Sequence, residues 1–529
     1  MTRMREDAAG VVRYISTEEE LGWARIIVWH QGDDLASPVF EGAFSARGDI
    51  YHVMTKENYL RMKGEFDAEI GDGVSELDEQ LVIWRDSDLM SAEEEAVLKG
   101  TDVRTKPQTC GHDRLDWNKN LDRKQVPMSG GDWLGVDSRD PSFGLSLLGN
   151  FSLAKRDDAA GNGMSTNFVS SIGNPDGCPT TQKILYMGVA ADCQFVSKYG
   201  SKDKATQQIL NDWNMASSLY KSTFNVSLGI VELQVQNPEC PAQADPKLPW
   251  NVNCASAELD DRLSIFSQWR GDKGNDSIGL WHLMSGCPTG SEVGIAWLAT
   301  LCQQSSSGKP GSVVSGTGVS TAGLTEWQVV AHEIGHNFGA IHDCADGCES
   351  NSGSCCPLES ASTCNANAKF IMSPVAQSGE QFFSRCSLGN VCKYPGAFTR
   401  SCIWLTDTLG SLMKGITGGK TDTSCLADPG TSTRQTISLK MCGNGIVEPG
   451  EDCDPGVGTN STCCDSSTCK FKNGAVCDPA SSPCCTGQCG FAPSSQVCRP
   501  AKDDRCDTAE MCTGSSAACP NDVVKPNGE

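Results

Sequence analysis

The 29 cysteines of this chain are very unevenly distributed over its 529 residues. Only Cys110 lies in the first 177 residues, whereas fourteen lie between Cys178 and Cys402 and fourteen more between Cys425 and Cys519. Dense cysteine is typical of proteins that fold in an oxidising compartment, so we expect a secretory-pathway protein, extracellular or at the cell surface. The two even sets predict two units, each closed by its own disulfides, with one thiol left over.

The first ten residues, MTRMREDAAG, contain no apolar stretch that could serve as a signal peptide. No run of 18 apolar residues that could cross a bilayer occurs elsewhere in the sequence. We therefore expect an incomplete chain, with its signal peptide and any membrane anchor outside it. Residence in the cytosol is the alternative, against which the cysteines argue. Four Asn-x-Ser/Thr sequons agree with a secreted glycoprotein: Asn150, Asn225, Asn275 and Asn460.

The segment 332–343 reads HEIGHNFGAIHD and contains three of the seven histidines. On an α-helix, His332 and His336 project from one face, one turn apart. Gly339 allows the helix to end and the chain to swing back, which returns His342 to the same point in space. Three imidazoles leave one open position on a tetrahedral Zn²⁺, and an open position is typical of a catalytic site. The alternative is a solvated helix that carries two histidines by chance.

Glu333 directly follows the first of these histidines, so we expect it to face the open side of the metal. There it can act as general base for a zinc-activated water and pass the proton to the leaving amine of a peptide bond. A surface salt bridge is the alternative role for this carboxylate. Thr325 and Gln328 predict a capping box ahead of the apolar run 329–331, so that a helix begins where the motif needs one.

With its terminal Asp343, the zinc motif resembles that of the adamalysin (reprolysin, ADAM) branch of the metzincin metalloproteases. The spacing in the disintegrin-like region and the short loops look most like those of fungal ADAM proteins. The stretch 369–374 resembles the Met-turn of the family, which implies that Met372 supports the base of the zinc site. The stretch 294–302 resembles the edge strand that binds substrate, and 442–454 the start of a disintegrin domain. The resemblance implies a zinc endopeptidase, with one catalytic Zn²⁺, that cleaves extracellular or cell-surface proteins and is made as a latent zymogen.

The expected fold class is multidomain, with a β-rich propeptide, an α/β metzincin catalytic domain and an irregular, disulfide-rich disintegrin domain. The expected boundaries are 1–156 for the propeptide, 157–181 for a linker, 182–412 for the metalloprotease domain, 413–440 for a second linker and 441–529 for the disintegrin domain. Periodicity predicts strands at 26–30, 51–54, 183–190, 228–235, 277–283 and 292–301, and helices at 202–222, 256–269 and 399–412. Arg156 ends a dibasic pair, which predicts processing by a kexin-type protease.

Cys110 resembles the cysteine switch of the family, because it stands alone in the predicted propeptide. A thiolate would occupy the open position on the zinc and displace the water. An unpaired structural cysteine, or one whose partner lies outside the chain, is the alternative. The disintegrin resemblance also implies two Ca²⁺ sites, because clustered oxygen ligands suit this ion. The implied ligands are Asn444, Glu448, Glu451, Asp454 and the Ile446 carbonyl for one site, and Asp507, Glu510, Asp522 and the Val523 carbonyl for the other. Solvated acidic turns are the alternative to these sites.

Several partners are not expected. The net charge of −23 argues against nucleic acid and anionic membranes, although we prefer to read the charge as serving solubility. The Arg-Gly-Asp tripeptide at 47–49 lies in the predicted propeptide, and the matching disintegrin loop at 498–506 has none, so integrin recognition is not expected. The rival hypothesis is an adhesion protein with an incidental protease domain. The intact zinc motif with Glu333 favours a protease that acts on proteins and peptides.

Overall fold

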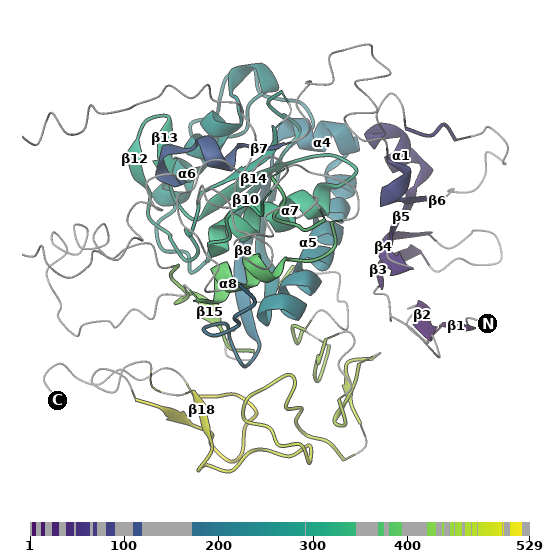
Figure 1. The fold of residues 1–529 in the computed structure, drawn as a ribbon, viewed down its shortest axis with the longest axis vertical. Helices are drawn as coiled ribbons and strands as arrows, with labels where there is room; N and C mark the ends of the chain where they lie inside the picture. The colour runs from purple at the N-terminus through teal and green to yellow at the C-terminus, as the bar shows by residue number, and fades with distance from the viewer. Residues whose placement is uncertain are drawn as a thin grey trace, which may run out of the picture.

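The structure, a computed structural model, describes most of the chain from residue 172 onward and shorter stretches before it (Figure 1). The described residues are 3–6, 12–15, 24–30, 39–46, 49–63, 67–70, 81–89, 109–118, 172–290, 292–344, 369–374, 380–393, 421–429, 436–437, 445–448, 450–456, 461–466, 468–472, 474–499, 501 and 508–520. They confirm the expected fold class, since a β-rich N-terminal region, a mixed α/β domain and an irregular disulfide-rich region follow one another.

The N-terminal region is built on a four-stranded antiparallel sheet in the order β3-β4-β5-β6. Its elements are β1 (Arg3–Glu6), β2 (Val12–Ile15), β3 (Ala24–His30), β4 (Val39–Ala46), β5 (Asp49–Thr55), α1 (Lys56–Met62), β6 (Leu81–Arg85) and η1 (Asp86–Asp88). The predicted strands at 26–30 and 51–54 fall within β3 and β5. Helix α1 begins after Thr55, because its hydroxyl accepts a hydrogen bond from the Asn58 N–H.

The central domain contains a seven-stranded sheet in the order β15-β8-β10-β14-β11-β7, with β9 also paired to β8. Strands β8, β9, β10 and β14 are parallel, and β11 runs antiparallel to β14. The domain's elements are β8 (Lys183–Ala191), α4 (Cys193–Tyr199), α5 (Lys202–Phe224), β9 (Val226–Val235), η5 (Cys254–Ser256), α6 (Leu259–Asp272), β10 (Leu280–Ser285), β11 (Glu292–Ala296), β12 (Ser307–Lys309), β13 (Ser312–Val314), β14 (Thr317–Thr321), α7 (Glu326–Phe338), α8 (Arg385–Lys393) and β15 (Leu426–Ala427). Two segments of the N-terminal region join it: β7 (Thr109–Cys110), which pairs with β11, and η2 (Gly111–Arg114).

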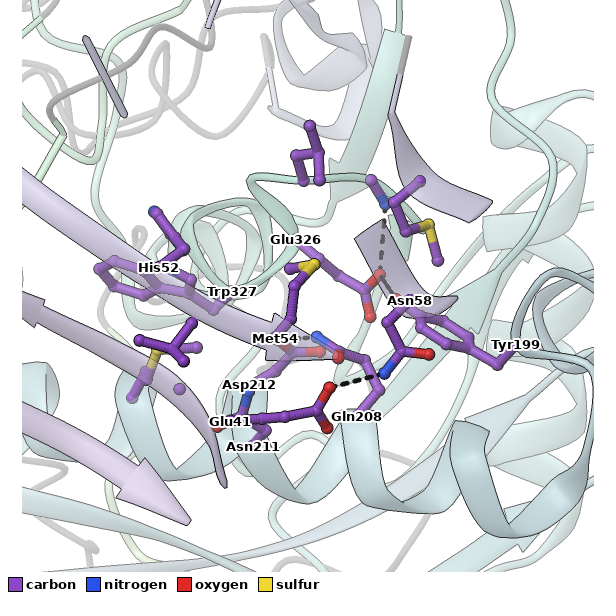
Figure 2. A pocket seen from close by; sticks show the side chains of 16 residues that line it. Glu41, His52, Met54, Asn58, Tyr199, Gln208, Asn211, Asp212, Glu326 and Trp327 are labelled. Atoms are coloured by element: carbon purple, nitrogen blue, oxygen red, sulfur yellow. Dashed lines mark hydrogen bonds between the residues drawn. The ribbon is translucent and has the colours of Figure 1, made fainter. Parts of the chain in front are cut away.

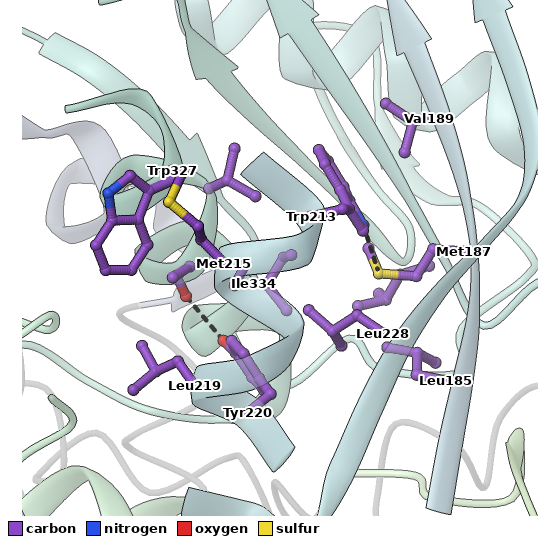
Figure 3. Close-up of a cluster of buried hydrophobic side chains, with 14 of the residues drawn as sticks. Leu185, Met187, Val189, Trp213, Met215, Leu219, Tyr220, Leu228, Trp327 and Ile334 are labelled. Carbon is purple, nitrogen blue, oxygen red and sulfur yellow. Dashed lines mark hydrogen bonds between the residues drawn. The ribbon is translucent and has the colours of Figure 1, made fainter. Parts of the chain in front are cut away.

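Helices cover both faces of this sheet. Alternate residues of β10 point to opposite sides, so Leu280 and Met284 enter the core shared with α5 and α7, while Trp281 and Leu283 pack under α6. Figure 3 shows how α5 links the sheet to α7. Its Trp213 indole contacts Met187 Sδ on β8 at 3.5 Å, and its Tyr220 hydroxyl donates to the Ala331 carbonyl on α7 at 2.8 Å. Helix α7 is therefore packed against α5.

Most of the helices and strands predicted for the central domain are present, but some of them begin or end at other residues than predicted. The predicted strand 292–301 stops at Ala296, because Ala299 and Cys302 adopt positive φ angles of 55° and 64° and the chain turns there. The predicted helix 256–269 begins at Leu259 instead, after the short turn η5. The predicted helix at 399–412 and the processing site at Arg156 lie outside the described residues.

The expectation that the two cysteine sets close separately is wrong for one bond. Cys302 is bonded to Cys425, which joins the first set to the second. Next to it, β15 pairs antiparallel with β8, so the predicted linker at 413–440 contains a strand of the central sheet. Other bonds among the described residues stay within their sets. They are Cys178–Cys392, Cys193–Cys240 and Cys254–Cys287 in the first, and Cys453–Cys464, Cys463–Cys489, Cys477–Cys485, Cys484–Cys512 and Cys498–Cys519 in the second.

Among its described residues the C-terminal region contains only short strands, as expected for a region that depends on disulfides for its order. They are β16 (Cys464–Asp465), β17 (Lys470–Phe471), β18 (Val497–Arg499) and β19 (Glu510–Met511). The region also touches the central domain, since Lys221 near the end of α5 donates to the Pro455 carbonyl at 3.1 Å. In the part of the chain that the structure describes, no helix is long and apolar enough to span a bilayer.

The N-terminal sheet packs against the central domain at a second place, through β3 and β4 on α5 and through α1 on α4. Figure 2 shows a pocket in this interface, lined by Glu41 from β4, Asp212 from α5 and Glu326 from α7. Asp212 and Glu326 are both buried, and the charge of Glu326 adds to the effect of burial on the Asp212 carboxyl. Burial raises the pKa of both carboxyls, that of Asp212 well above its ordinary value.

We expect Asp212→Asn to stabilise the full chain at neutral and alkaline pH. Because the folded pKa values are raised, the folded chain keeps a proton that the unfolded chain releases, so the free energy of unfolding falls as pH rises above the ordinary carboxyl range. The amide needs no such proton, and each kcal/mol gained would raise Tm by roughly 2–4 °C. Thermal unfolding of parent and variant between pH 4 and 8 checks this. Equal Tm differences at both ends of the range would contradict it, since the gain must vanish in acid.

Candidate functional site

Helix α7 carries His332, Glu333 and His336, and all its side chains are buried. It ends at Gly339, whose φ of 102° lies in the left-handed region that favours glycine. The chain then turns back and brings His342 beside the other two histidines. The sequence prediction that these side chains converge therefore agrees with their positions in the structure.

The predicted capping box at the start of α7 is wrong. Thr325 is the N-cap residue, but its side chain makes no capping hydrogen bond. Its ψ of 27° is far from the extended conformation in which a threonine hydroxyl reaches the next turn. The Gln328 side chain instead donates to the Asp86 carboxylate of the N-terminal region at 3.2 Å. The helix therefore begins through packing and long-range contacts rather than through a local cap.

The Nε2 atoms of the three histidines point at one another. The distance from His332 Nε2 is 3.0 Å to His336 Nε2 and 3.2 Å to His342 Nε2. Tetrahedral zinc with Zn–N bonds of about 2.0–2.1 Å places its nitrogen ligands about 3.4 Å apart, so the cluster fits this ion. Burial lowers the pKa of His332 to about 3 and that of His336 well below its ordinary value, which keeps both rings in the neutral form that binds metals.

The other ring nitrogen of each histidine has its own hydrogen-bond acceptor. His332 Nδ1 lies 2.6 Å from the Ile371 carbonyl, and His336 Nδ1 lies 2.8 Å from the Ala340 carbonyl. A proton on Nδ1 leaves the Nε2 lone pair free for a metal, so these acceptors select the tautomer that zinc requires. His342 Nδ1 also has an acceptor, which belongs to the N-terminal region.

Met372 is fully buried and packs against helix α7 at Gly335. A Cβ atom at Gly335 of α7 would lie 2.6 Å from Met372 Sδ, so only glycine allows this close approach. The Met372 carbonyl accepts from the Asp343 N–H at 2.8 Å, and the Asp343 carboxylate accepts from the Ser384 hydroxyl at 2.6 Å. Burial raises the pKa of Asp343 to about 7. Met372 and Asp343 thus connect the segments that surround the histidines.

The Glu333 carboxyl is buried beside this cluster, and its Oε2 makes no hydrogen bond among the described residues. Burial raises its pKa well above the ordinary value, and a hydrogen bond from the Cys110 thiol acts in the opposite direction. A Cβ atom at Gly294 of β11 would lie 2.2 Å from Glu333 Oε1, so a larger residue would displace the carboxyl. The carboxyl therefore lies directly against strand β11.

Cys110 lies at the fourth corner of the cluster. Its Sγ is 3.5 Å from His336 Nε2, and the four candidate ligand atoms all lie within 4.8 Å of one another. It is the free cysteine among the described residues. Burial raises the pKa of its thiol, whereas a bound dication would favour the thiolate. The donor set of three imidazoles and one thiol therefore fits zinc.

A small pocket adjoins Glu333 and Cys110 at the cluster. The other residues that line it are Val293, Thr325, Gln328, Val329, His332, Ser373, Pro374 and Glu380. The pocket lies between the edge strand, the start of α7 and the stretch that follows Met372. It is therefore in a position to receive a side chain of a peptide bound along β11.

Comparison with known proteins agrees with this geometry. Residues 180–384 match the family described as metallo-peptidase family M12, in its reprolysin branch, and residues 448–522 match the disintegrin family. The chain combines a reprolysin-type M12 metallopeptidase domain with a disintegrin domain. It is 39% identical to disintegrin and metalloproteinase domain-containing protein B of Aspergillus fumigatus, over 96% of this chain and 62% of that protein. It therefore spans just under two thirds of the length of that relative.

Two further relatives show how far the likeness extends. The protein of the same name from Arthroderma otae is 34% identical, over 98% of this chain and 63% of its own length. Zinc metalloprotease mde10 of Schizosaccharomyces pombe is 33% identical, over 64% of this chain and 65% of its own length. The recognition of a fungal ADAM-type metalloprotease from the sequence is confirmed by these matches.

The first set of candidate calcium ligands is partly assembled in the disintegrin domain. Glu451 and Asp454 lie together with Cys469, and Asp454 is fully buried. Burial and the neighbouring Asp454 raise the pKa of Glu451 to about 8. Glu448 contributes its N–H to Glu451 at 2.9 Å, while its own carboxylate accepts from the Thr436 hydroxyl. Ile446, two residues before Glu448 in the sequence, is also buried.

Of the second set, Glu510 alone lies among the described residues, so the set stays a prediction. Glu510 lies on β19 and forms an ion pair with Arg499 of β18, which gives its carboxylate a partner within the strand pair. Asn444 of the first set and Asp507, Asp522 and Val523 of the second lie outside the described residues.

The sequence reading missed the residues around Cys110 that dock it. Asn118 is fully buried. Its side chain accepts from the Leu298 N–H at 2.8 Å and donates to the Ala296 carbonyl at 3.1 Å. The His112 ring stacks on His336, with ring centroids 3.5 Å apart. The segment 109–118, TCGHDRLDWN, contains both apolar and polar residues after the cysteine. This mixture was the signal in the sequence that the segment could pack against another surface.

Proposed function

We propose that this chain is a zinc endopeptidase made as a latent zymogen, which hydrolyses peptide bonds of extracellular or cell-surface proteins. The convergence of three buried imidazole nitrogens with the Glu333 carboxyl supports this proposal above all else. His332, His336 and His342 would hold the ion. When bound, Zn²⁺ supplies Lewis acidity toward a water molecule and a peptide carbonyl. The names of the relatives, which include a zinc metalloprotease, agree with this chemistry.

The roles of the chain's own groups follow from their positions. Glu333 lies against the edge strand, so its carboxylate can take a proton from water and return it to the leaving amine. Strand β11 pairs with β7 on one side, and in the absence of β7 that side could hydrogen-bond an extended substrate. Met372 and Asp343 would hold the segments around the histidines in place through their contacts with each other and with Ser384. Residues 182–412, together with β15, would form this catalytic domain.

A direct test is cleavage of an unfolded protein by the chain after its N-terminal region has been removed. Cleavage should stop when zinc is chelated and return when zinc is restored. Profiling the new N-termini released from a complex protein mixture would give the substrate preference. A preparation with one zinc per chain and no cleavage would contradict the proposal and leave the rival hypothesis of an adhesion protein.

Latency is attributed to residues 1–156 acting as a propeptide. Cys110 would occupy the fourth position on the zinc, and β7 would cover the edge of β11. Activation then requires removal of the propeptide, and we propose a kexin-type protease that cuts after Arg156.

We propose that the protein matures in the secretory pathway, because its disulfides need an oxidising compartment. Glycosylation tests this. Asn275 is exposed, whereas the Asn225 side-chain amide donates to the Pro179 carbonyl at 3.2 Å and its backbone N–H caps α5 by donating to the Lys221 carbonyl. We expect a glycan at Asn275 and none at Asn225 when the chain is expressed in a fungal host. Mass spectrometry of peptides after enzymatic deglycosylation measures both sites, and a glycan at Asn225 alone would contradict the structure.

We also propose that the disintegrin domain, residues 441–529, binds Ca²⁺ through the Glu451 and Asp454 cluster. The raised pKa of Glu451 supports it, since closely placed carboxylates gain from a cation between them. Integrin binding is not proposed.

Calcium removal should therefore loosen the disintegrin domain before the catalytic domain. With zinc kept saturated, we expect calcium chelation to bring early proteolytic cuts downstream of Cys425, because this region has little apolar core. Gel electrophoresis with N-terminal sequencing of the fragments locates the cuts. Glu451→Gln should produce the same pattern without chelation, and Glu258→Gln, at an exposed position of the central domain, should not. First cuts within 182–412 would refute the order.

A further inference from the structure

The three candidate zinc ligands differ in what holds their Nδ1 atoms. His332 and His336 donate to backbone carbonyls of the catalytic domain itself. The acceptor for His342 Nδ1 is the carboxylate of Asp113, at 2.8 Å, which belongs to the proposed propeptide. His342 is only 2% exposed and Asp113 18% exposed, so the pair is largely shielded from water. This contact disappears when the propeptide leaves.

The position of Asp113 is fixed by the segment around it. It lies in η2, between β7 and a second anchored stretch. Before it, Cys110 pairs with Gly294 of β11. After it, Leu115 packs in the core under α6, and the Asn118 side chain bonds to backbone groups just beyond β11. The carboxylate is thus presented to His342 by a segment that is held at both ends.

The same segment touches a second ligand through an aromatic ring. His112 is fully buried and stacks on His336, with the ring planes 11° apart. Its carbonyl accepts from the Asn118 amide at 2.9 Å, which keeps the ring in place. Two of the three imidazoles are therefore packed or hydrogen-bonded by side chains of the N-terminal region. The contacts of this region with the metal site extend beyond Cys110.

We propose that Asp113 is a positioning residue for His342, through which the propeptide strengthens zinc binding in the latent chain. This rests on the zinc site and latency proposed above. A carboxylate that accepts from Nδ1 fixes the tautomer and the ring orientation and makes Nε2 a stronger donor to the metal. Loss of such a partner typically lowers metal affinity about 10–100-fold. The zymogen would then load zinc tightly, and processing would remove both Cys110 and the carboxylate behind His342.

The test measures zinc affinity rather than activity. Uncleaved full-length parent, Asp113→Asn and Asp116→Asn chains are titrated against a chromogenic chelator of known zinc affinity. Asp116 is an exposed acid two residues after Arg114 and serves as the matched control. We expect Asp113→Asn to bind zinc about 10–100-fold more weakly than parent, and Asp116→Asn to match parent. Equal melting temperatures of the metal-free chains would exclude misfolding.

A further measurement separates positioning from simple docking. Cobalt-loaded zymogen should show a thiolate-to-metal charge-transfer band from Cys110, and Asp113→Asn should keep this band. As a control on the titrations, removal of the N-terminal region after Arg156 yields the same mature chain from all three proteins, and their zinc affinities must then be equal.

Zymogen affinity unchanged by Asp113→Asn would overturn the proposal. A band lost together with affinity would also overturn it, because Asp113 would then act by docking the propeptide. If the band is absent from the parent as well, the proposed role of Cys110 fails, while the affinity comparison still decides the role of Asp113.

Discussion

Replacing Glu333 with Ala is expected to lower peptide cleavage by the processed enzyme at least about 10²-fold while zinc stays bound, because the general base is lost and the ligands are not. The carboxyl lies against Gly294 of the edge strand, and no ring nitrogen of the cluster depends on it for a hydrogen bond. Steady-state cleavage of a peptide, together with zinc content by atomic absorption, measures both quantities.

Glu258→Ala is a suitable control, because this exposed glutamate at the start of α6 makes no capping hydrogen bond through its side chain. It should cleave like the parent. If Glu333→Ala also cleaves like the parent, the proposed mechanism is wrong. If it loses zinc along with activity, the loss belongs to the metal site and the general-base role is not supported.

Replacing Cys110 with Ser is expected to raise the activity of the uncleaved chain at least about tenfold, which corresponds to about 1.4 kcal/mol of lost metal contact. A serine hydroxyl is a far weaker zinc ligand than a thiolate, so water and substrate can compete for the fourth position. The measurement is peptide cleavage by full-length chains in which processing is blocked by Arg156→Ala. Asp116→Asn in the same background is the control and should remain latent.

The same chains allow an independent check of the thiol. Alkylation followed by mass spectrometry should find Cys110 unmodified while zinc is bound and modified after zinc is chelated. A disulfide between Cys110 and any other cysteine in the full-length protein would rule out the switch. Unchanged activity of Cys110→Ser would place latency in the β7–β11 pairing alone.

The histidine cluster could be predicted from the sequence because its geometry is almost entirely local. Two ligands lie one helical turn apart, and Gly339 supplies the turn that returns the third. Apolar runs also predicted β3 and β5 of the N-terminal region and β8 to β11 of the central domain, whereas β14, which lies between β10 and β11 in the sheet, was not predicted. The fold class and the family were inferred from the zinc motif and from the stretches around it that resemble family motifs. The matches at 180–384 and 448–522 confirm both.

What sequence reasoning missed depends on contacts between distant segments. Gln328 was expected to serve a local cap, but Asp86, far away in the sequence, is its partner. The bond between Cys302 and Cys425 spans 123 residues, and no spacing rule assigns such a pair. The same holds for Asp113 and His342, whose pairing requires that β7 lie beside β11. Periodicity reports the face a side chain occupies, not the partner it meets there.

The N-terminal region holds the catalytic domain at two separate places, along β11 and on α5. Because both contacts belong to one chain, release of either leaves the other to hold the freed part at high effective concentration, so it rebinds readily. A cut at Arg156 does not sever the connection between the two contacts. The cleaved region would therefore leave slowly, and the delay between cutting and full activity would depend on avidity rather than on the strength of the metal–thiol contact alone.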